Sequence, residues 1–192
     1  FSPETFVRIQ GKEITSYPMK GTLAVSENNK EEDLRHDYKE KAEHATIVDL
    51  IRNDLSQVAF PIQVEKYQYI ERVKTHTGEL WQMSSKITGT IMPEFERKFG
   101  SILMKLLPAG SITGAPKKAT MELIKKAEQY ERGFYTGIMG KFDGTNFNSG
   151  VLIRFIEKST KGLIYKSGGG ITVFSEVQKE YNELIQKVYL PF

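Results

Sequence analysis

A long stretch free of glycine and proline, residues 31–58, constrains the fold most strongly. Apolar residues such as Leu34, Val48 and Leu55 recur in it at a roughly helical period. Nothing inside it removes a backbone donor or adds the conformational freedom that breaks a helix. We therefore expect one long helix here, ended by Pro61.

The other expected elements come in groups of strands and groups of helices. Strand patterns lie over 5–10, 13–17, 62–73, 80–91, 134–142, 147–157 and 163–166, the first two joined at Gly11-Lys12 and the last three forming a meander. Helix patterns lie over 93–106, 116–129 and a last segment to about 188, which Ser175 and Gln178 open as a capping box. Grouped elements predict an α+β fold with mainly antiparallel sheet.

Composition excludes several classes of protein. The chain has 192 residues, 39% hydrophobic and 27% charged, which suits one packed domain or at most two. A net charge of +3 is too small to indicate nucleic acid, and no apolar run approaches a membrane span. The absence of cysteine removes thiolate chemistry and fits a reducing compartment. The chain begins with Phe1 and shows no signal peptide, so we expect a fragment or a processed product.

A lysine lies on a rigid turn near the beginning of the chain, between Pro18 and Gly21. Proline fixes one backbone angle and glycine permits unusual ones, so Lys20 can be aimed inward. A desolvated lysine loses its proton more easily and becomes a nucleophile. A surface lysine in an ordinary turn is the alternative.

Two pairs of glutamates share a helix face. Glu40 and Glu43 lie three residues apart on the first expected helix, and Glu180 and Glu183 do so on the last. Four carboxylates from two facing helices would suit Mg²⁺, which prefers oxygen ligands. Two solvated helix faces are the alternative.

Glycine-containing loops and one arginine suit an anion. The loop over 110–117 lacks the spacing of a phosphate-binding loop, but the following helix start favours a phosphate or a carboxylate. Gly168, Gly169 and Gly170 either let backbone amides approach a ligand or form a tight turn. Arg154 ends an apolar strand, and its guanidinium matches a carboxylate.

The histidines His36, His44 and His76 match neither a metal-ligand spacing nor a catalytic triad. We expect each of them on a surface or a helix face.

Together these segments resemble the chorismate-utilising enzymes, over nearly the whole chain from Ser2 to Lys187. The matching blocks occur in the family's order: Ser2-Pro3-Glu4, 18–22, 42–44, 47–54, 110–117, 132–137, Ile153-Arg154, 168–171, 180–183 and Lys187. The resemblance implies a two-sheet antiparallel sandwich flanked by helices, as in anthranilate synthase component I. Family members are longer, so residues 1–192 are expected to be the C-terminal part of one chorismate-binding catalytic domain, incomplete at the N-terminus.

Within that family, Lys20 is characteristic of the aminodeoxychorismate synthase component I branch, whereas anthranilate synthases usually carry alanine there. The resemblance implies that Lys20 attacks carbon 2 of chorismate and that Glu4 protonates the departing hydroxyl. Ammonia then displaces the lysine, on the route to para-aminobenzoate and folate. A dry site would keep the lysine neutral.

The resemblance also implies the rest of the site. Glu43 and Glu183 match the Mg²⁺ ligands, with Glu40 and Glu180 beside them. The positions that match the substrate-holding residues and the pocket wall are Thr113, Gly114, Tyr135, Arg154, Gly168, Gly169, Gly170 and Lys187. A glutamine amidotransferase subunit would supply ammonia, in the cytoplasm, with neither nucleic acid nor membrane as a partner.

Four positions depart from the family pattern: Thr46, Gln82, Phe155 and Phe174. Gln82 stands where many relatives have an active-site histidine, which weakens any role for histidine. Anthranilate synthase component I, a non-catalytic anion-binding relative and a nucleotide-binding protein are the alternative functions.

Overall fold

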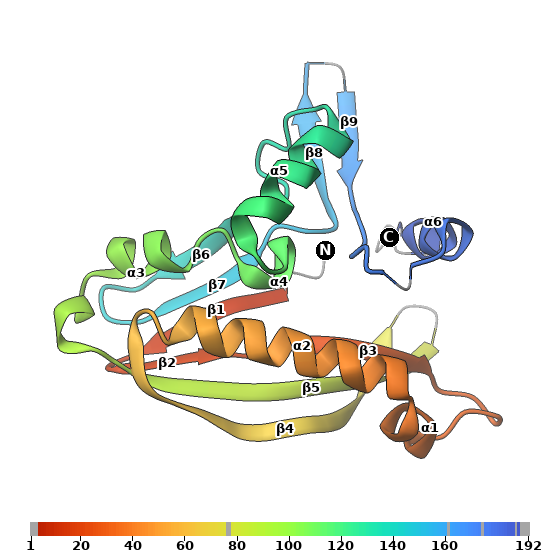
Figure 1. The fold of residues 1–192 in the computed structure, drawn as a ribbon, viewed down its shortest axis with the longest axis horizontal. Helices are drawn as coiled ribbons and strands as arrows, with labels where there is room; N and C mark the ends of the chain where they lie inside the picture. The colour runs from red at the N-terminus through yellow and green to blue at the C-terminus, as the bar shows by residue number, and fades with distance from the viewer. Residues whose placement is uncertain (1–3, 76–77, 161, 174, 187, 189–192) are drawn as a thin grey trace.

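The computed structural model describes residues 4–75, 78–160, 162–173, 175–186 and 188. Helices and strands are both present, and the strand pairs of the described residues are antiparallel. The strands of the described residues form one seven-stranded sheet and one two-stranded ribbon. The expected α+β class with antiparallel sheet is confirmed (Figure 1).

A long hairpin of β4 (Ala59–Thr75) and β5 (Gly78–Ile91) forms the lower part of the sheet in Figure 1. One edge of β5 pairs with β4, and the other pairs with β2 and β3 in succession. Pro61 lies inside β4 and does not end a helix, contrary to expectation. β4 is an edge strand of the described sheet, where a missing backbone donor is tolerated.

The first strands run as β1 (Glu4–Gln10), β2 (Glu13–Ser16) and β3 (Met19–Ala24). The hairpin between β1 and β2 is confirmed, and Gly11 takes a φ of 59° in its turn. The segment after Pro18, expected to be a turn and a loop, is strand β3. Its pairing with the distant β5 explains why local sequence did not indicate it.

The expected single helix over 31–58 is two helices, α1 (Glu31–His36) and α2 (Tyr38–Leu55). Asp37 separates them in an extended conformation with ψ of 110°. Its carboxylate accepts a hydrogen bond of 2.9 Å from the backbone N–H of Glu40. Aspartate is a favoured N-cap residue, so a new helix begins inside a continuous helical sequence pattern.

The segment after β5 is also more divided than expected. A 3₁₀ turn, η1 (Pro93–Phe95), and α3 (Phe99–Leu106) replace the single helix over 93–106. The expected loop after Pro108 contains a one-turn helix, α4 (Gly110–Thr113). α5 (Lys117–Glu128) follows directly after Pro116, as the sequence indicated.

The expected strand over 147–157 is two strands in different sheets. β6 (Ile138–Phe142) and β7 (Phe147–Val151) extend the main sheet beside β1. β8 (Phe155–Ser159) and β9 (Gly162–Lys166) form the separate ribbon. Between β7 and β8, Arg154 has a left-handed φ of 52°, which no continuous strand allows.

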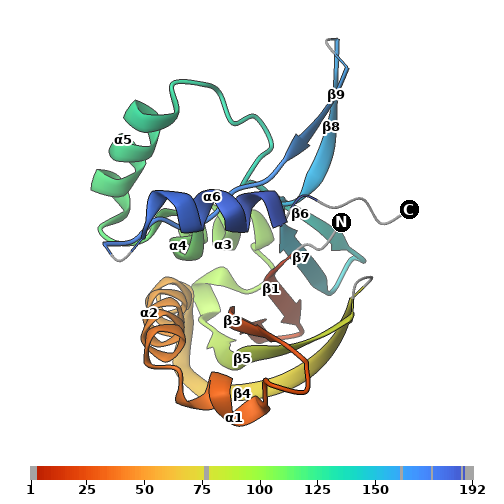
Figure 2. The same ribbon diagram turned by 90° about the vertical axis from the view of Figure 1, so that its right-hand side faces the viewer.

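The main core lies between the sheet and the helices α2 and α3. Its fully buried side chains include Ile9, Ile14, Leu55, Ile87 and Ile102. In both views, β4 lies at one side of the molecule, and α5 and the β8–β9 ribbon lie at the other (Figures 1 and 2). The last helix, α6 (Val177–Gln186), lies between them, over α2 in Figure 2. No helix among the described residues is long and apolar enough to cross a membrane.

Candidate active site

The predicted nucleophile, Lys20, lies in a β-bulge. The register of β3 against β5 shifts between Met19 and Thr22, so Lys20 and Gly21 together face the single residue Met83. Gly21 has a φ of 98°, a conformation that side chains disfavour, which explains glycine at this position. Bulges re-aim side chains and interrupt the ladder of backbone hydrogen bonds. The kink that the sequence indicated is therefore real, although it lies inside a strand.

Carboxylates surround the Lys20 ammonium. Its Nζ lies 2.8 Å from Oε2 of Glu43 on α2. Burial acts to lower the pKa of Lys20, but the hydrogen bond to Glu43 and the charges of Glu43, Glu40 and Glu183 outweigh it. The net pKa is raised, so the expectation that a dry site keeps this lysine neutral is not met in this state.

Glu4, the expected proton donor, lies at the start of β1 close to the same lysine. Burial raises the pKa of its carboxyl above the ordinary value of 4.5. Arg154, the backbone N–H of Met19 and Lys20 oppose that shift without cancelling it. A carboxyl with a raised pKa retains its proton more readily, which is the property that a general acid needs.

Three of the four paired glutamates lie near Lys20. Glu183 of α6 and both glutamates of α2 act on its charge. Glu180 accepts a 2.6 Å hydrogen bond from the hydroxyl of Ser175. The carboxylate oxygens suit a hard cation. Within the described part of the chain, no group of three or more His, Cys, Asp or Glu residues is arranged to hold a metal ion.

Two of the expected substrate-binding positions are in contact. Tyr135 is buried, and a Cβ added to Gly168 would collide with its hydroxyl. Glycine therefore lets the backbone of the 168–170 segment lie against the tyrosine. The same segment approaches α6, because a Cβ on Gly169 would lie 3.6 Å from Oε2 of Glu180.

The other predicted site residues, Arg154, Thr113, Gly114 and Lys187, come from other parts of the chain. Arg154 acts on the charge of Glu4 from the β7–β8 junction. Thr113 and Gly114 end the short helix α4, and the Thr113 hydroxyl donates to backbone carbonyls 3.2 Å away. Lys187 lies outside the described residues.

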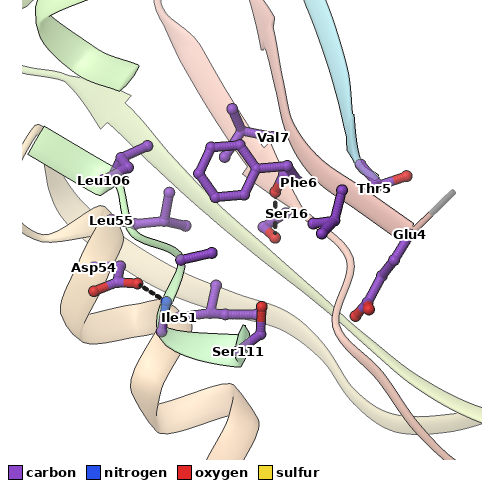
Figure 3. A pocket seen from close by; sticks show the side chains of 13 residues that line it. Glu4, Thr5, Phe6, Val7, Ser16, Ile51, Asp54, Leu55, Leu106 and Ser111 are labelled. Carbon is purple, nitrogen blue, oxygen red and sulfur yellow. Dashed lines mark hydrogen bonds between the residues drawn. The ribbon is translucent and has the colours of Figure 1, made fainter. Parts of the chain in front are cut away.

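A cavity of about 20 Å³ connects Glu4 to the α2–α4 contact (Figure 3). Glu4 lies at one edge of it and Asp54 at the other, with Ile51 and Ser111 between them. Asp54 accepts a 2.8 Å hydrogen bond from the backbone N–H of Gly110 and lies 2.6 Å from Nζ of Lys117. The space is sufficient for about one water molecule, so it is not the substrate site.

Sequence reasoning missed two residues that hold the bulge. His44, expected on a surface or a helix face, is fully buried, and its Nδ1 lies 2.9 Å from the carbonyl oxygen of Lys20. Gln82 donates from Nε2 to the carbonyl of Gly21 at 2.9 Å. The signal for His44 was its position one residue after Glu43 on the helix face that meets β3. For Gln82, the resemblance marked the position as one where many relatives have an active-site histidine, but nothing local indicated its contact with the bulge.

Three kinds of comparison with known proteins agree on one family. Residues 1–191 match the chorismate binding enzyme family. An uncharacterized PabA-like protein of Pasteurella multocida is 51% identical over all of this chain and 59% of its own length. Aminodeoxychorismate synthase component 1 of Bacillus subtilis is 32% identical over 98% of this chain and 40% of its own length. The crystal structure of anthranilate synthase component I from Streptococcus pneumoniae aligns with a TM-score of 0.82 and 31% identity, over 97% of this chain and 41% of that chain.

The chain belongs to the chorismate binding enzyme family. Its fold is like that of anthranilate synthase component I, as the sequence indicated. The chain spans about three fifths of the length of the first curated relatives that it matches. An aminodeoxychorismate synthase component 1 and an anthranilate synthase component I match this chain at 32% and 31% sequence identity. Sequence identity therefore does not distinguish these two branches of the family.

Proposed function

We propose that this chain is the C-terminal part of the catalytic domain of an aminodeoxychorismate synthase component I. The observation that carries the proposal is the lysine in the β3 bulge, surrounded by carboxylates and close to a glutamate of raised pKa. The bulge of β3 would supply the nucleophile, and the start of β1 would supply the proton donor. Anthranilate synthases usually have alanine in place of this lysine, which favours the amino-transferring branch.

The proposed reaction uses both residues. The lone pair of Lys20 Nζ attacks carbon 2 of chorismate, both ring double bonds shift, and the carbon 4–oxygen bond breaks. Glu4 donates a proton to the departing hydroxyl, which leaves as water, because hydroxide is a poor leaving group. Ammonia then adds at carbon 4, both double bonds shift back, the Lys20 nitrogen leaves carbon 2 as a neutral amine, and the new ammonium group returns a proton to Glu4. The net change replaces the 4-hydroxyl of chorismate by an amino group and releases one water.

Lys20 must lose a proton before it attacks. The negative charges of Glu43, Glu40 and Glu183 raise its pKa, so neutralising these carboxylates would lower it. We assign Glu43 and Glu183 as ligands of Mg²⁺, with Glu40 and Glu180 beside them. Bound Mg²⁺ would supply positive charge for the ring carboxylate of chorismate.

The substrate's carboxylates would meet the other polar groups of the site. Arg154 offers a charged donor, Tyr135 a hydroxyl, and Gly168, Gly169 and Gly170 backbone amides. Lys187, Thr113 and Gly114 complete the proposed set. We also propose a glutamine amidotransferase subunit as the source of ammonia, in agreement with the PabA-like names of two relatives, and a cytoplasmic location.

A product assay tests the proposal. The full-length protein is incubated with chorismate, Mg²⁺ and an ammonium salt, and the products are separated by chromatography. We expect 4-amino-4-deoxychorismate. Anthranilate and pyruvate as the main products would contradict the assignment in favour of anthranilate synthase. Unchanged turnover in Lys20→Ala would contradict the mechanism, which predicts collapsed turnover with largely retained chorismate binding.

A further inference from the structure

Side chains from other elements bind both backbone carbonyls of the bulge, those of Lys20 and Gly21. Lys20 and Gly21 lie opposite one residue of β5, so their pairing with that strand is interrupted. Gly21 is buried and Lys20 is half-buried, so water reaches these carbonyls only in part. Buried carbonyls need a donor, because an unmade hydrogen bond costs about 1–3 kcal/mol. Side chains from two other elements supply these donors.

The first donor is His44, on the face of α2 that packs against β3. Its Nδ1 lies 2.9 Å from the Lys20 carbonyl, and its Nε2 lies 2.7 Å from the hydroxyl of Ser85. A carbonyl only accepts, so Nδ1 carries the proton. Ser85 Oγ accepts from the N–H of Gln68 at 2.9 Å, so its own proton is directed to Nε2. The ring is thus fixed on both sides in one tautomer, with both His44 and Ser85 fully buried.

The second donor is Gln82 on β5. Its Nε2 lies 2.9 Å from the carbonyl of Gly21 and 3.1 Å from the carbonyl of Met83. Both partners accept only, which fixes the orientation of the amide. The turn before the bulge is held as well, because the N–H of Ser85 donates to the carbonyl of Pro18 at 3.0 Å.

We propose that His44 and Gln82 are positioning residues for Lys20: each holds one carbonyl of the bulge, and together they fix the direction of the lysine side chain. The proposal rests on the proposed function, in which Lys20 is the nucleophile. A nucleophile displaced by about 1 Å loses on the order of 10²-fold in rate, so small movements of the bulge should be visible in turnover.

Matched variants separate positioning from general stability. Gln82→Met keeps the length of the side chain and removes the donor. Because Gln82 lies on β5, the change leaves the glutamates of α2 and α6 untouched. His44→Asn keeps a donor near the place of Nδ1, whereas His44→Gln moves the donor toward the place of Nε2 and loses the bond to Lys20. Asp143→Ala is the control, because it removes the carboxylate that accepts from Thr145 and Asn146 in the distant β6–β7 turn.

The assay is steady-state turnover of chorismate with saturating ammonium and Mg²⁺, together with urea unfolding of each variant. We expect kcat to fall at least about tenfold in Gln82→Met and His44→Gln, with KM within about twofold of wild type. His44→Asn should retain kcat within about threefold, and Asp143→Ala should lose stability without losing kcat. The proposal is overturned if kcat in Gln82→Met and His44→Gln equals that of Asp143→Ala after correction for the folded fraction.

In the same assay, the variant Lys20→Met distinguishes failure of the proposed function from failure of the positioning proposal. If Lys20→Met retains turnover, the proposed function fails. If Lys20→Met abolishes turnover while Gln82→Met and His44→Gln match wild type, only the positioning proposal fails, and the proposed function stands.

Discussion

Asp54 provides a quantitative test of how the α2–α4 contact is held. It is buried at the end of α2, accepts the N–H of Gly110 at 2.8 Å, and pairs with Lys117 at 2.6 Å. Asp54→Ala leaves the Gly110 N–H buried without its acceptor, which costs about 1–3 kcal/mol. The lost ion pair adds about 0–1 kcal/mol, because the Lys117 side chain is 27% exposed and also donates to the carbonyl of Pro108. We expect a total loss of about 1–4 kcal/mol in the free energy of unfolding.

Asp54→Asn separates the two contributions. Its amide oxygen still accepts from Gly110, so only the ion pair is lost, and we expect a decrease of about 0–1 kcal/mol. Asp49→Ala is the matched control on the same helix, because Asp49 pairs with Arg52 while its side chain is 80% exposed. It should change stability by less than about 0.5 kcal/mol. Urea unfolding followed by circular dichroism measures all three. Equal stability losses in Asp54→Ala and Asp49→Ala would refute the reasoning.

The remaining predictions concern Glu4 and Gly168. Glu4→Gln should lower kcat by about 10²–10⁴-fold, because proton donation to the leaving group is lost, and wild-type turnover in the product assay would exclude that role. The pKa of Glu4 is raised in the fold, so its contribution to stability is fully present below the ordinary value of 4.5 and is lost as pH rises through the folded value. As pH rises, the urea midpoint of Glu4→Gln should therefore increase relative to that of the wild-type protein. A difference between the two midpoints that does not change with pH would contradict this. Gly168→Ala places a Cβ against the Tyr135 hydroxyl, so KM for chorismate should rise with little loss of global stability, and an unchanged KM would show that this contact does not shape the site.

Local patterns predicted the elements that depend on local chemistry. The β1–β2 hairpin, the long strands before and after residue 77, and α5 after Pro116 all follow from turn residues and periodicity. Breaks were missed where one residue overrides a continuous pattern. Asp37 caps a new helix inside an unbroken helical period, and Arg154 turns the chain out of the main sheet.

The strand β3 was missed for a different reason. Its residues form a strand because β5, more than fifty residues later, offers an open edge. The bulge at Lys20 follows from that register, and so do the functions of His44 and Gln82. No local periodicity encodes which distant side chains bind the carbonyls of a bulge. The acidic pairs were visible from spacing, but the approach of Glu40, Glu43 and Glu183 to Lys20 depends on where the fold places α2 and α6.

The raised pKa of Lys20 is the point at which the structure changes the sequence interpretation most. Desolvation was expected to dominate and to give a neutral amine. The hydrogen bond to Glu43 and three nearby carboxylate charges reverse the direction. Two of these carboxylates, those of Glu43 and Glu183, are the proposed ligands of Mg²⁺, so a bound cation would neutralise part of the charge that holds the proton on Lys20.

A covalent intermediate on Lys20 tests the central claim most directly. The full-length protein is mixed with chorismate and Mg²⁺ without ammonium, quenched, digested and analysed by mass spectrometry. The account predicts that the peptide containing Lys20 gains the mass of chorismate less one water, and that the gain disappears when ammonium is added before the quench. An unmodified Lys20 peptide during active formation of 4-amino-4-deoxychorismate would contradict it.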